Sequence, residues 1–289
     1  MSPSAGSEPS ALRPLPPVDT RPLFLPLHGE LLALLEGLSS GDWERGTVAG
    51  RWRVRDVAAH LIDGDLRRLS LQRDGHALSL PREAMASEEG LVTFLNALNA
   101  DWVRAAARLS PRILLELLRS AGKAAATFLV SLDPEGRAFL PVGWAGEAVS
   151  KNWMDVGREY TERWHHQQQI RLAVGAPLLL DPRWLRPVLE LSLRALPHRY
   201  RRVEAREGES LQIEIGGASG GSYALVRGRE AWQLLAGTAA EPAARIVVDE
   251  DAAWRVLFKA WPEGAPPVVG REGRPELTQA FLTAWAVMA

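Results

Sequence analysis

The chain has 289 residues, of which 46% are hydrophobic and 24% charged, so it can bury one large core or two modest ones. A net charge of -1 excludes a general electrostatic attraction to nucleic acid or to an anionic membrane surface. Because the chain contains no cysteine, disulfides, cysteine nucleophiles, zinc ribbons and iron–sulfur sites are excluded, and any metal must bind to His, Asp or Glu.

Seven prolines among residues 1–26 exclude a regular helix or a central strand, so this segment is expected to be a Pro-rich leader. Later segments show the apolar spacing of three and four residues that is typical of helices. They are residues 27–38, 53–69, 87–109 with Ser87 as N-cap, and a segment that begins at Ser110-Pro111. A Gly-rich and Pro-rich loop is expected over residues 133–149, and a last long helix over residues 153–174, ended by Gly175. Residues 27–178 are therefore expected to form an up-down four-helix bundle.

The pattern changes beyond Pro182, where short alternating segments are mixed with helical ones. Helices are predicted over residues 185–196, 249–261 and 275–288, and strands over residues 211–215, 222–225, 231–235 and 245–248. The second and third strands flank Arg227-Gly228-Arg229 like a hairpin. Residues 183–289 are therefore expected to form a smaller α+β unit.

Three residues suggest a metal site. Glu162 and His166 lie four residues apart on the last predicted helix, a spacing that stacks two side chains on one face. His60, at the edge of the apolar face of the second helix, is expected to point toward the interior of the bundle. Two imidazoles and one carboxylate form a three-ligand set typical of a catalytic divalent metal site. The alternative is a solvated Glu–His pair and a hydrogen-bonded histidine without metal. His165 is the nearest competing ligand, but it points about 100° away from His166.

The run Trp-Arg-Val-Arg-Asp-Val-Ala-Ala-His-Leu-Ile-Asp-Gly-Asp, residues 52–65, resembles the second-helix signature of the mycothiol-dependent maleylpyruvate isomerase family, whose metal-binding domain is DinB-like. Residues 38–43 and 162–171 resemble the exit of the family's first helix and its E-x3-H segment. The resemblance covers residues 24–175 and implies a four-helix bundle that holds a divalent metal, usually zinc. Carried over, the metal ligands are His60, Glu162 and His166, the residues that spacing also selects.

The resemblance also implies a reaction and a second domain. A low-molecular-weight thiol such as mycothiol would bind as thiolate and add to an electrophilic carbon, giving isomerisation or thiol transfer. The family's isomerase has a sterol-carrier-like α+β domain, which agrees in kind with residues 183–289. Gln169 stands where many members have Asp, and it is a candidate cofactor contact together with Trp144 and Trp164, whose rings could exclude water from the mouth of the site.

Two other functions stay open. A metal-hydroxide hydrolase would use Glu147 or His165 as a proton shuttle. A non-catalytic module would hold the metal structurally, with His165 or another fourth ligand, and bind a lipid or other small molecule in its C-terminal unit.

The sequence also suggests where the protein acts and on what. No stretch approaches the ~20 apolar residues of a membrane-spanning helix, and no signal-peptide pattern opens the chain. We expect a cytoplasmic monomer or homodimer that acts on a small molecule, with neither nucleic acid nor membrane as partner.

Overall fold

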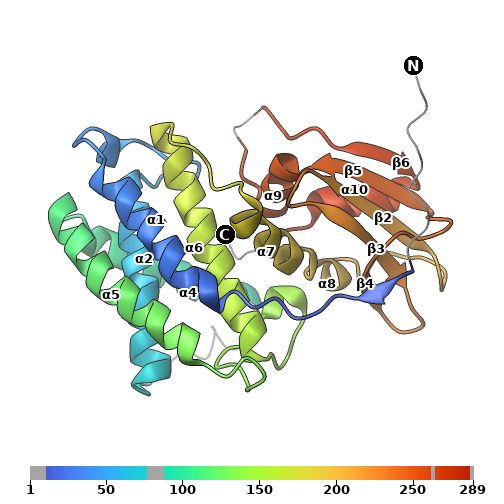
Figure 1. Ribbon diagram of the computed structural model, residues 1–289, viewed down its shortest axis with the longest axis horizontal. Coiled ribbons are helices and arrows are strands. Elements are labelled where there is room, and N and C mark those ends of the chain that lie inside the picture. Colours follow the sequence, from blue (N-terminus) through green and yellow to red (C-terminus); the bar gives the residue numbers. More distant parts are fainter. Residues whose placement is uncertain (1–10, 77–87, 262–263, 287–289) are drawn as a thin grey trace.

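The computed structural model describes residues 11–76, 88–261 and 264–286. Long helices form one end of the molecule, and a six-stranded sheet with its own helices forms the other (Figure 1). This arrangement confirms the expected fold class, a helical bundle followed by a smaller α+β unit. No helix within the described ranges is both long enough and apolar enough to cross a membrane.

Four helices pack against one another in the bundle, and a fifth lies along one of them. The four are α1 (Phe24–Glu36), α2 (Val54–Arg68), α5 (Pro111–Ser131) and α6 (Asn152–Val174), and α4 (Glu88–Ala106) packs against α2. The hydroxyl of Ser110 caps α5 by accepting a hydrogen bond from the backbone N–H of Ile113, as its place before Pro111 predicts. Gly175 ends α6 in the left-handed region, with φ of +71°. The predicted N-cap Ser87 of α4 lies outside the described residues.

The Pro-rich leader contains more regular structure than we predicted. Helix α1 begins at Phe24, ahead of residue 27, because Pro26 lies in the first turn, where a helix has no N–H bond to lose. Arg13–Pro14 form strand β1, which pairs antiparallel with β4 (Trp232–Ala236). Only one side of an edge strand makes ladder hydrogen bonds, so proline is tolerated there.

The C-terminal unit is a mixed sheet with strand order β1-β4-β3-β2-β5-β6. Its other strands are β2 (Ser210–Gly216), β3 (Gly221–Arg227), β5 (Ala244–Asp249) and β6 (Gly270–Gly273), and its helices are α7 (Pro182–Leu193), α8 (Leu196–Arg199), α9 (Glu250–Phe258) and α10 (Pro275–Thr283). The predicted β3–β4 hairpin is confirmed, and β2 and β5 run parallel. Strand β6 was not predicted, because all four of its residues are exposed and show no apolar alternation.

Helix α6 is shared by two apolar cores. Ile170 packs in the core of the bundle with the buried face of α2. Tyr160 and Trp164 belong instead to the larger core that continues into the C-terminal unit. The Tyr160 hydroxyl donates to the carbonyl of Trp184, 2.9 Å away, and Trp164 Nε1 donates to the carbonyl of Leu179, 3.1 Å away. The helix expected to carry two metal ligands is therefore fixed from both sides.

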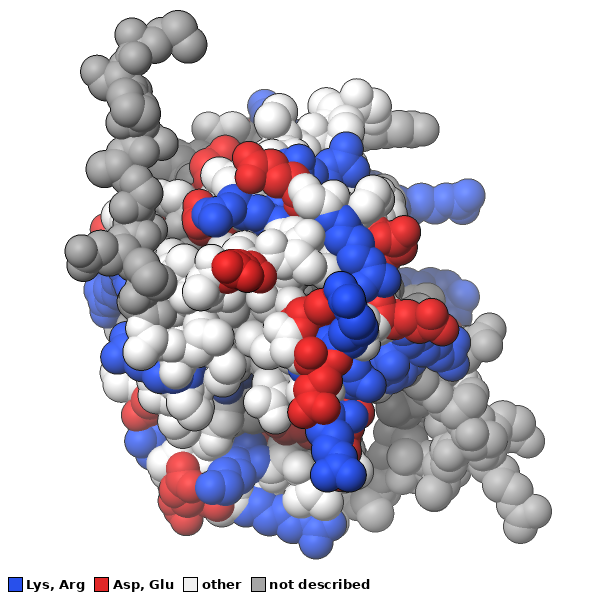
Figure 2. Space-filling view, turned by 90° about the vertical axis from the view of Figure 1, so that its right-hand side faces the viewer, with Lys and Arg blue, Asp and Glu red and all other residues white. Residues whose placement is uncertain are grey.

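The right-hand face of the molecule in Figure 1 shows no large patch of one charge. Lys and Arg side chains lie beside Asp and Glu across this face (Figure 2). The mixed pattern agrees with the near-neutral net charge of the chain.

Candidate metal centre

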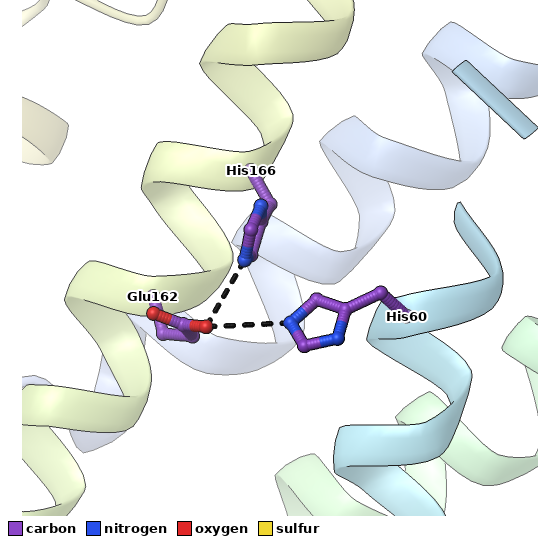
Figure 3. Close-up of side chains that lie close together, drawn as sticks. All are labelled: His60, Glu162 and His166. Carbon is purple, nitrogen blue, oxygen red and sulfur yellow. Dashed lines mark hydrogen bonds and ion pairs between the residues drawn. The ribbon is translucent and has the colours of Figure 1, made fainter. Parts of the chain in front are cut away.

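The three predicted ligands converge between α2 and α6. His60, Glu162 and His166 each offer a ligand atom, and these atoms lie within 4.8 Å of one another. Oε1 of Glu162 is 3.0 Å from Nε2 of His166 and 3.5 Å from Nε2 of His60. Both imidazoles turn this nitrogen toward the same carboxylate oxygen (Figure 3). The i, i+4 spacing on α6 and the buried face of α2 thus bring together the residues that the sequence selected.

Burial and mutual charge set the protonation of this cluster. Burial opposes ionisation of Glu162, but the charge and hydrogen bond of His166 and those of His60 hold the pKa of the carboxyl well below its ordinary range. For His166, burial is outweighed by the Glu162 carboxylate, which raises the pKa of this imidazole. Burial lowers the pKa of His60, partly offset by the hydrogen bond to Glu162. Glu162 is therefore an anion at neutral pH, as a metal ligand must be.

The two histidines differ in how their outer nitrogen is held. Nδ1 of His166 donates a hydrogen bond to Oε1 of Gln169 over 2.8 Å. Nδ1 of His60 is buried and has no hydrogen-bond partner among the described residues. The ring of Trp52 covers both imidazoles, with centroids 5.0 Å from His60 and 6.4 Å from His166. One ligand is thus oriented by a hydrogen bond and the other by aromatic packing.

A cavity of about 240 Å³ opens beside the cluster. His60 and Glu162 form part of its wall, so a ligand in the cavity could reach a metal held by them. Four arginines from α2 and α6 line it, namely Arg67, Arg68, Arg158 and Arg163. Apolar side chains also line it, among them Leu95 of α4 and Phe139, Leu140 and Trp144 of the loop that follows α5.

Carboxylates of α2 and α6 pair with the cavity arginines. Arg68 contacts Asp155 at 2.9 and 3.2 Å and Glu159 at 2.6 Å. Arg163 pairs with Asp65 on α2 at 2.5 Å, which joins the two ligand-bearing helices just beyond Glu162. The Nε atoms of three of these arginines are buried without a hydrogen-bond partner within the described ranges: Arg67, Arg158 and Arg163. The wall of the cavity thus contains four guanidinium groups, the kind of group that binds anionic ligands, together with the carboxylates Glu159 and Glu162.

Comparison with known families matches residues 24–171 to the mycothiol maleylpyruvate isomerase N-terminal domain. The chain belongs to this family. The match confirms the resemblance carried by residues 52–65 and 162–171. Comparison with curated proteins finds no match to this chain.

Two solved structures share the fold. They are a crystal structure of the mycothiol-dependent maleylpyruvate isomerase and one of a histidine-to-alanine mutant of it. Each is 12% identical to this chain, with a TM-score of 0.55, and the similarity covers 91% of this chain and 96% of the other. The arrangement of a helical bundle followed by an α+β unit is therefore common to these proteins.

Within this family member, the other candidate residues lie in different surroundings. Trp144 lines the cavity, and its buried Nε1 has no hydrogen-bond partner among the described residues. Trp164 is a core residue between the two units and does not line the cavity. Glu147 accepts a hydrogen bond from the hydroxyl of Ser150 and is also absent from the cavity wall. Burial lowers the pKa of His165 to about 3, and its ring faces the C-terminal unit.

Sequence reasoning missed the four cavity arginines. Arg158 and Arg163 lie four residues before and one residue after Glu162, and Arg67 lies seven residues after His60. Residues at spacings of three, four and seven share a helix face. Helical spacing from the metal ligands could therefore have placed part of this set on the ligand-bearing faces.

Proposed function

We propose that this chain is a divalent-metal-dependent enzyme that uses a low-molecular-weight thiol, of the mycothiol kind, to isomerise an electrophilic substrate or to transfer the thiol to it. Its family and the solved proteins of the same fold are named for mycothiol-dependent maleylpyruvate isomerase, which supports the use of a thiol. The observation that carries the proposal is the convergence of His60, Glu162 and His166 beside a cavity whose wall includes His60 and Glu162.

The donor set suits zinc. Two imidazole nitrogens and an ionised carboxylate oxygen lie within coordination reach of one point, and the described residues supply no fourth ligand to them. Three protein ligands with open positions are typical of catalytic zinc. A divalent ion held here would lower the pKa of a thiol or water molecule that binds to it. Because the chain has no cysteine, the thiol must come from outside the protein.

Side chains around the three proposed ligands and in the cavity wall support the rest of the proposed activity. Glu162 stays ionised, Gln169 accepts a hydrogen bond from Nδ1 of His166, and the ring of Trp52 packs beside the two imidazoles. The guanidinium groups of Arg158 and Arg163, which line the cavity, would hold an anionic group of the substrate. A small electrophile that carries carboxylates, such as maleylpyruvate, fits this set of donors.

The alternative functions have less support. The hydrolase hypothesis needs a proton shuttle at the metal, but Glu147 is bound to Ser150 and lies off the cavity wall. The non-catalytic module needs a closed metal site, but Nε2 of His165 lies 3.3 Å from Nε2 of Gln169 and does not join the cluster. In the proposal, residues 27–178 form the catalytic unit, residues 183–289 the second unit, and the enzyme acts on a small molecule in the cytoplasm.

Metal content and thiol binding test the proposal together. Purified wild type is expected to hold about one zinc per chain, while His60→Ala and His166→Ala lose it and keep their helicity. His76→Ala, a substitution of an exposed histidine, is the control that should keep the metal. With cobalt in place of zinc, added mycothiol should shift the visible absorption of wild type. Metal retained by both ligand variants, or a cobalt spectrum that no thiol perturbs, would contradict the proposal.

A further inference from the structure

The C-terminal unit touches the metal-bearing helix although none of its described residues lines the cavity. We propose that Phe258 of this unit positions the ligand imidazole of His166, acting through His165 and Gln169. The inference rests on the proposed metal-dependent function and assigns a role in it to residues 183–289. Three successive contacts connect α9 of this unit to the proposed metal ligand His166.

The first contact is aromatic. Phe258, 3% exposed, is the last residue of α9, and its ring centroid lies 4.7 Å from that of His165. The same ring lies 6.1 Å from Trp164, which also meets Trp254 of α9 edge to face at 5.3 Å. Two aromatic residues of α9 thus pack against the turn of α6 that immediately precedes His166. His165, 5% exposed, is enclosed by this packing.

The second contact orients an amide. The ring nitrogen Nε2 of His165 lies 3.3 Å from Nε2 of Gln169. An amide NH₂ group can only donate, so in this contact the ring nitrogen of His165 accepts and the NH₂ side of Gln169 faces it. Exposure of Gln169 is only 6%, which leaves few competing partners for either end of this amide.

The third contact fixes which nitrogen of His166, the proposed metal ligand, carries the proton. With its NH₂ group on His165, Gln169 presents Oε1 to Nδ1 of His166 at 2.8 Å and accepts its proton. Nδ1 then carries the hydrogen, and Nε2 is the nitrogen left to bind a metal beside Glu162 (Figure 3). The imidazoles of His165 and His166 also stack, with 5.7 Å between centroids and 23° between planes. Loss of Phe258 would open space around His165 and release the amide from its single orientation.

Measurement of the zinc affinity of the whole protein tests this series of contacts. In Phe258→Ala, the zinc dissociation constant measured by chelator competition is expected to rise about tenfold, the lower end of the range for outer-shell contacts. Phe281→Ala is the matched control, because Phe281 is fully buried in the same C-terminal core but on α10. Both variants should lower the melting temperature, but only Phe258→Ala should change the zinc affinity and the cobalt absorption spectrum. Phe258→Leu, which keeps an apolar side chain over His165, should restore most of the affinity.

A second variant keeps the test valid if Phe258→Ala does not fold. His165→Phe preserves the aromatic packing but removes the acceptor for the Gln169 amide, so it should weaken zinc binding by a similar factor. Nitrogen-15 NMR of the zinc form should show Nδ1 of His166 protonated in wild type and a changed signal in His165→Phe. Wild-type zinc affinity and an unchanged cobalt spectrum in the folded variants would overturn the inference alone. Absence of bound zinc in wild type would overturn the proposed function and this inference with it.

Discussion

Replacement of Glu159 by Gln isolates the energy of the buried ion pairs beneath the metal centre. Glu159 contacts Arg68 at 2.6 Å and Arg158 at 3.3 Å, with 19% of its side chain exposed. Burial opposes ionisation of this carboxyl, but the charges of Arg68, Arg158 and Arg163 outweigh it and lower its pKa from 4.5 to about 2. At about 1.4 kcal/mol per pKa unit, this difference stabilises the folded chain by about 3 kcal/mol at neutral pH.

The lowered pKa of Glu159 also predicts how the stability of the fold changes with pH. A carboxyl whose pKa is lower in the folded than in the unfolded chain stabilises the fold above the unfolded value, and this contribution is lost as the pH falls through the folded value. Glu159→Gln should therefore reduce the free energy of unfolding by about 3 kcal/mol at pH 7, and the deficit should shrink from about pH 4.5 down to about pH 2.

Urea unfolding of the metal-free proteins, followed by tryptophan fluorescence at several pH values, measures the difference. Glu116→Gln is the matched control, because this residue is 49% exposed and pairs with an arginine that is 87% exposed. A surface pair of this kind should change stability by less than about 1 kcal/mol. A Glu159→Gln deficit that is the same at pH 7 and near pH 3, or no larger than that of Glu116→Gln, would refute the electrostatic reasoning.

Three further predictions concern packing, metal and substrate. Gly122→Ala should destabilise the bundle by about 1–3 kcal/mol, because the new methyl carbon would lie 2.3 Å from the His28 ring, whereas Gly29→Ala has open space and should stabilise it by up to about 1 kcal/mol. Thermal melts of both would show the contrast, and equal melting temperatures would contradict it. Removal of zinc with a chelator should lower the melting temperature. The difference from the zinc-loaded sample should grow with the free zinc concentration in that sample. An unchanged melting temperature would mean that folding and metal binding are not coupled. Arg158→Gln should raise the KM for a carboxylate substrate more than it lowers kcat, and a pure loss of kcat would assign Arg158 another role.

Sequence analysis located the helices and site residues that are specified by nearby residues in the chain. Apolar spacing and helix caps place α2, α5 and α6 to within a few residues, and the i, i+4 pair of Glu162 and His166 follows from the geometry of one helix. The inward direction of His60 also follows from the apolar face of α2. These features need no knowledge of which helices become neighbours.

What escaped prediction depends on distant parts of the chain. The pairing of Arg13–Pro14 with β4 joins residues more than 200 positions apart, and nothing in either segment alone specifies it. From the sequence alone, the cavity arginines cannot be distinguished from solvated charges, because their role depends on how α2 and α6 face each other. The ring of Phe258 over His165 likewise depends on how α9 docks on α6. Long-range docking, not local propensity, decides all three.

The two-sided burial of α6 has a consequence for how the protein unfolds and how it can be divided. A fragment that ends after the bundle would leave Tyr160 and Trp164 facing water, and both are fully buried in the whole chain. The backbone amides of α6 should therefore exchange with deuterium only through unfolding of both units, and more slowly than those of α4 at the edge of the bundle. The helix that carries two of the three proposed ligands is therefore expected to open last. Although the two halves differ in architecture, the core that they share through α6 predicts that they unfold as one cooperative unit.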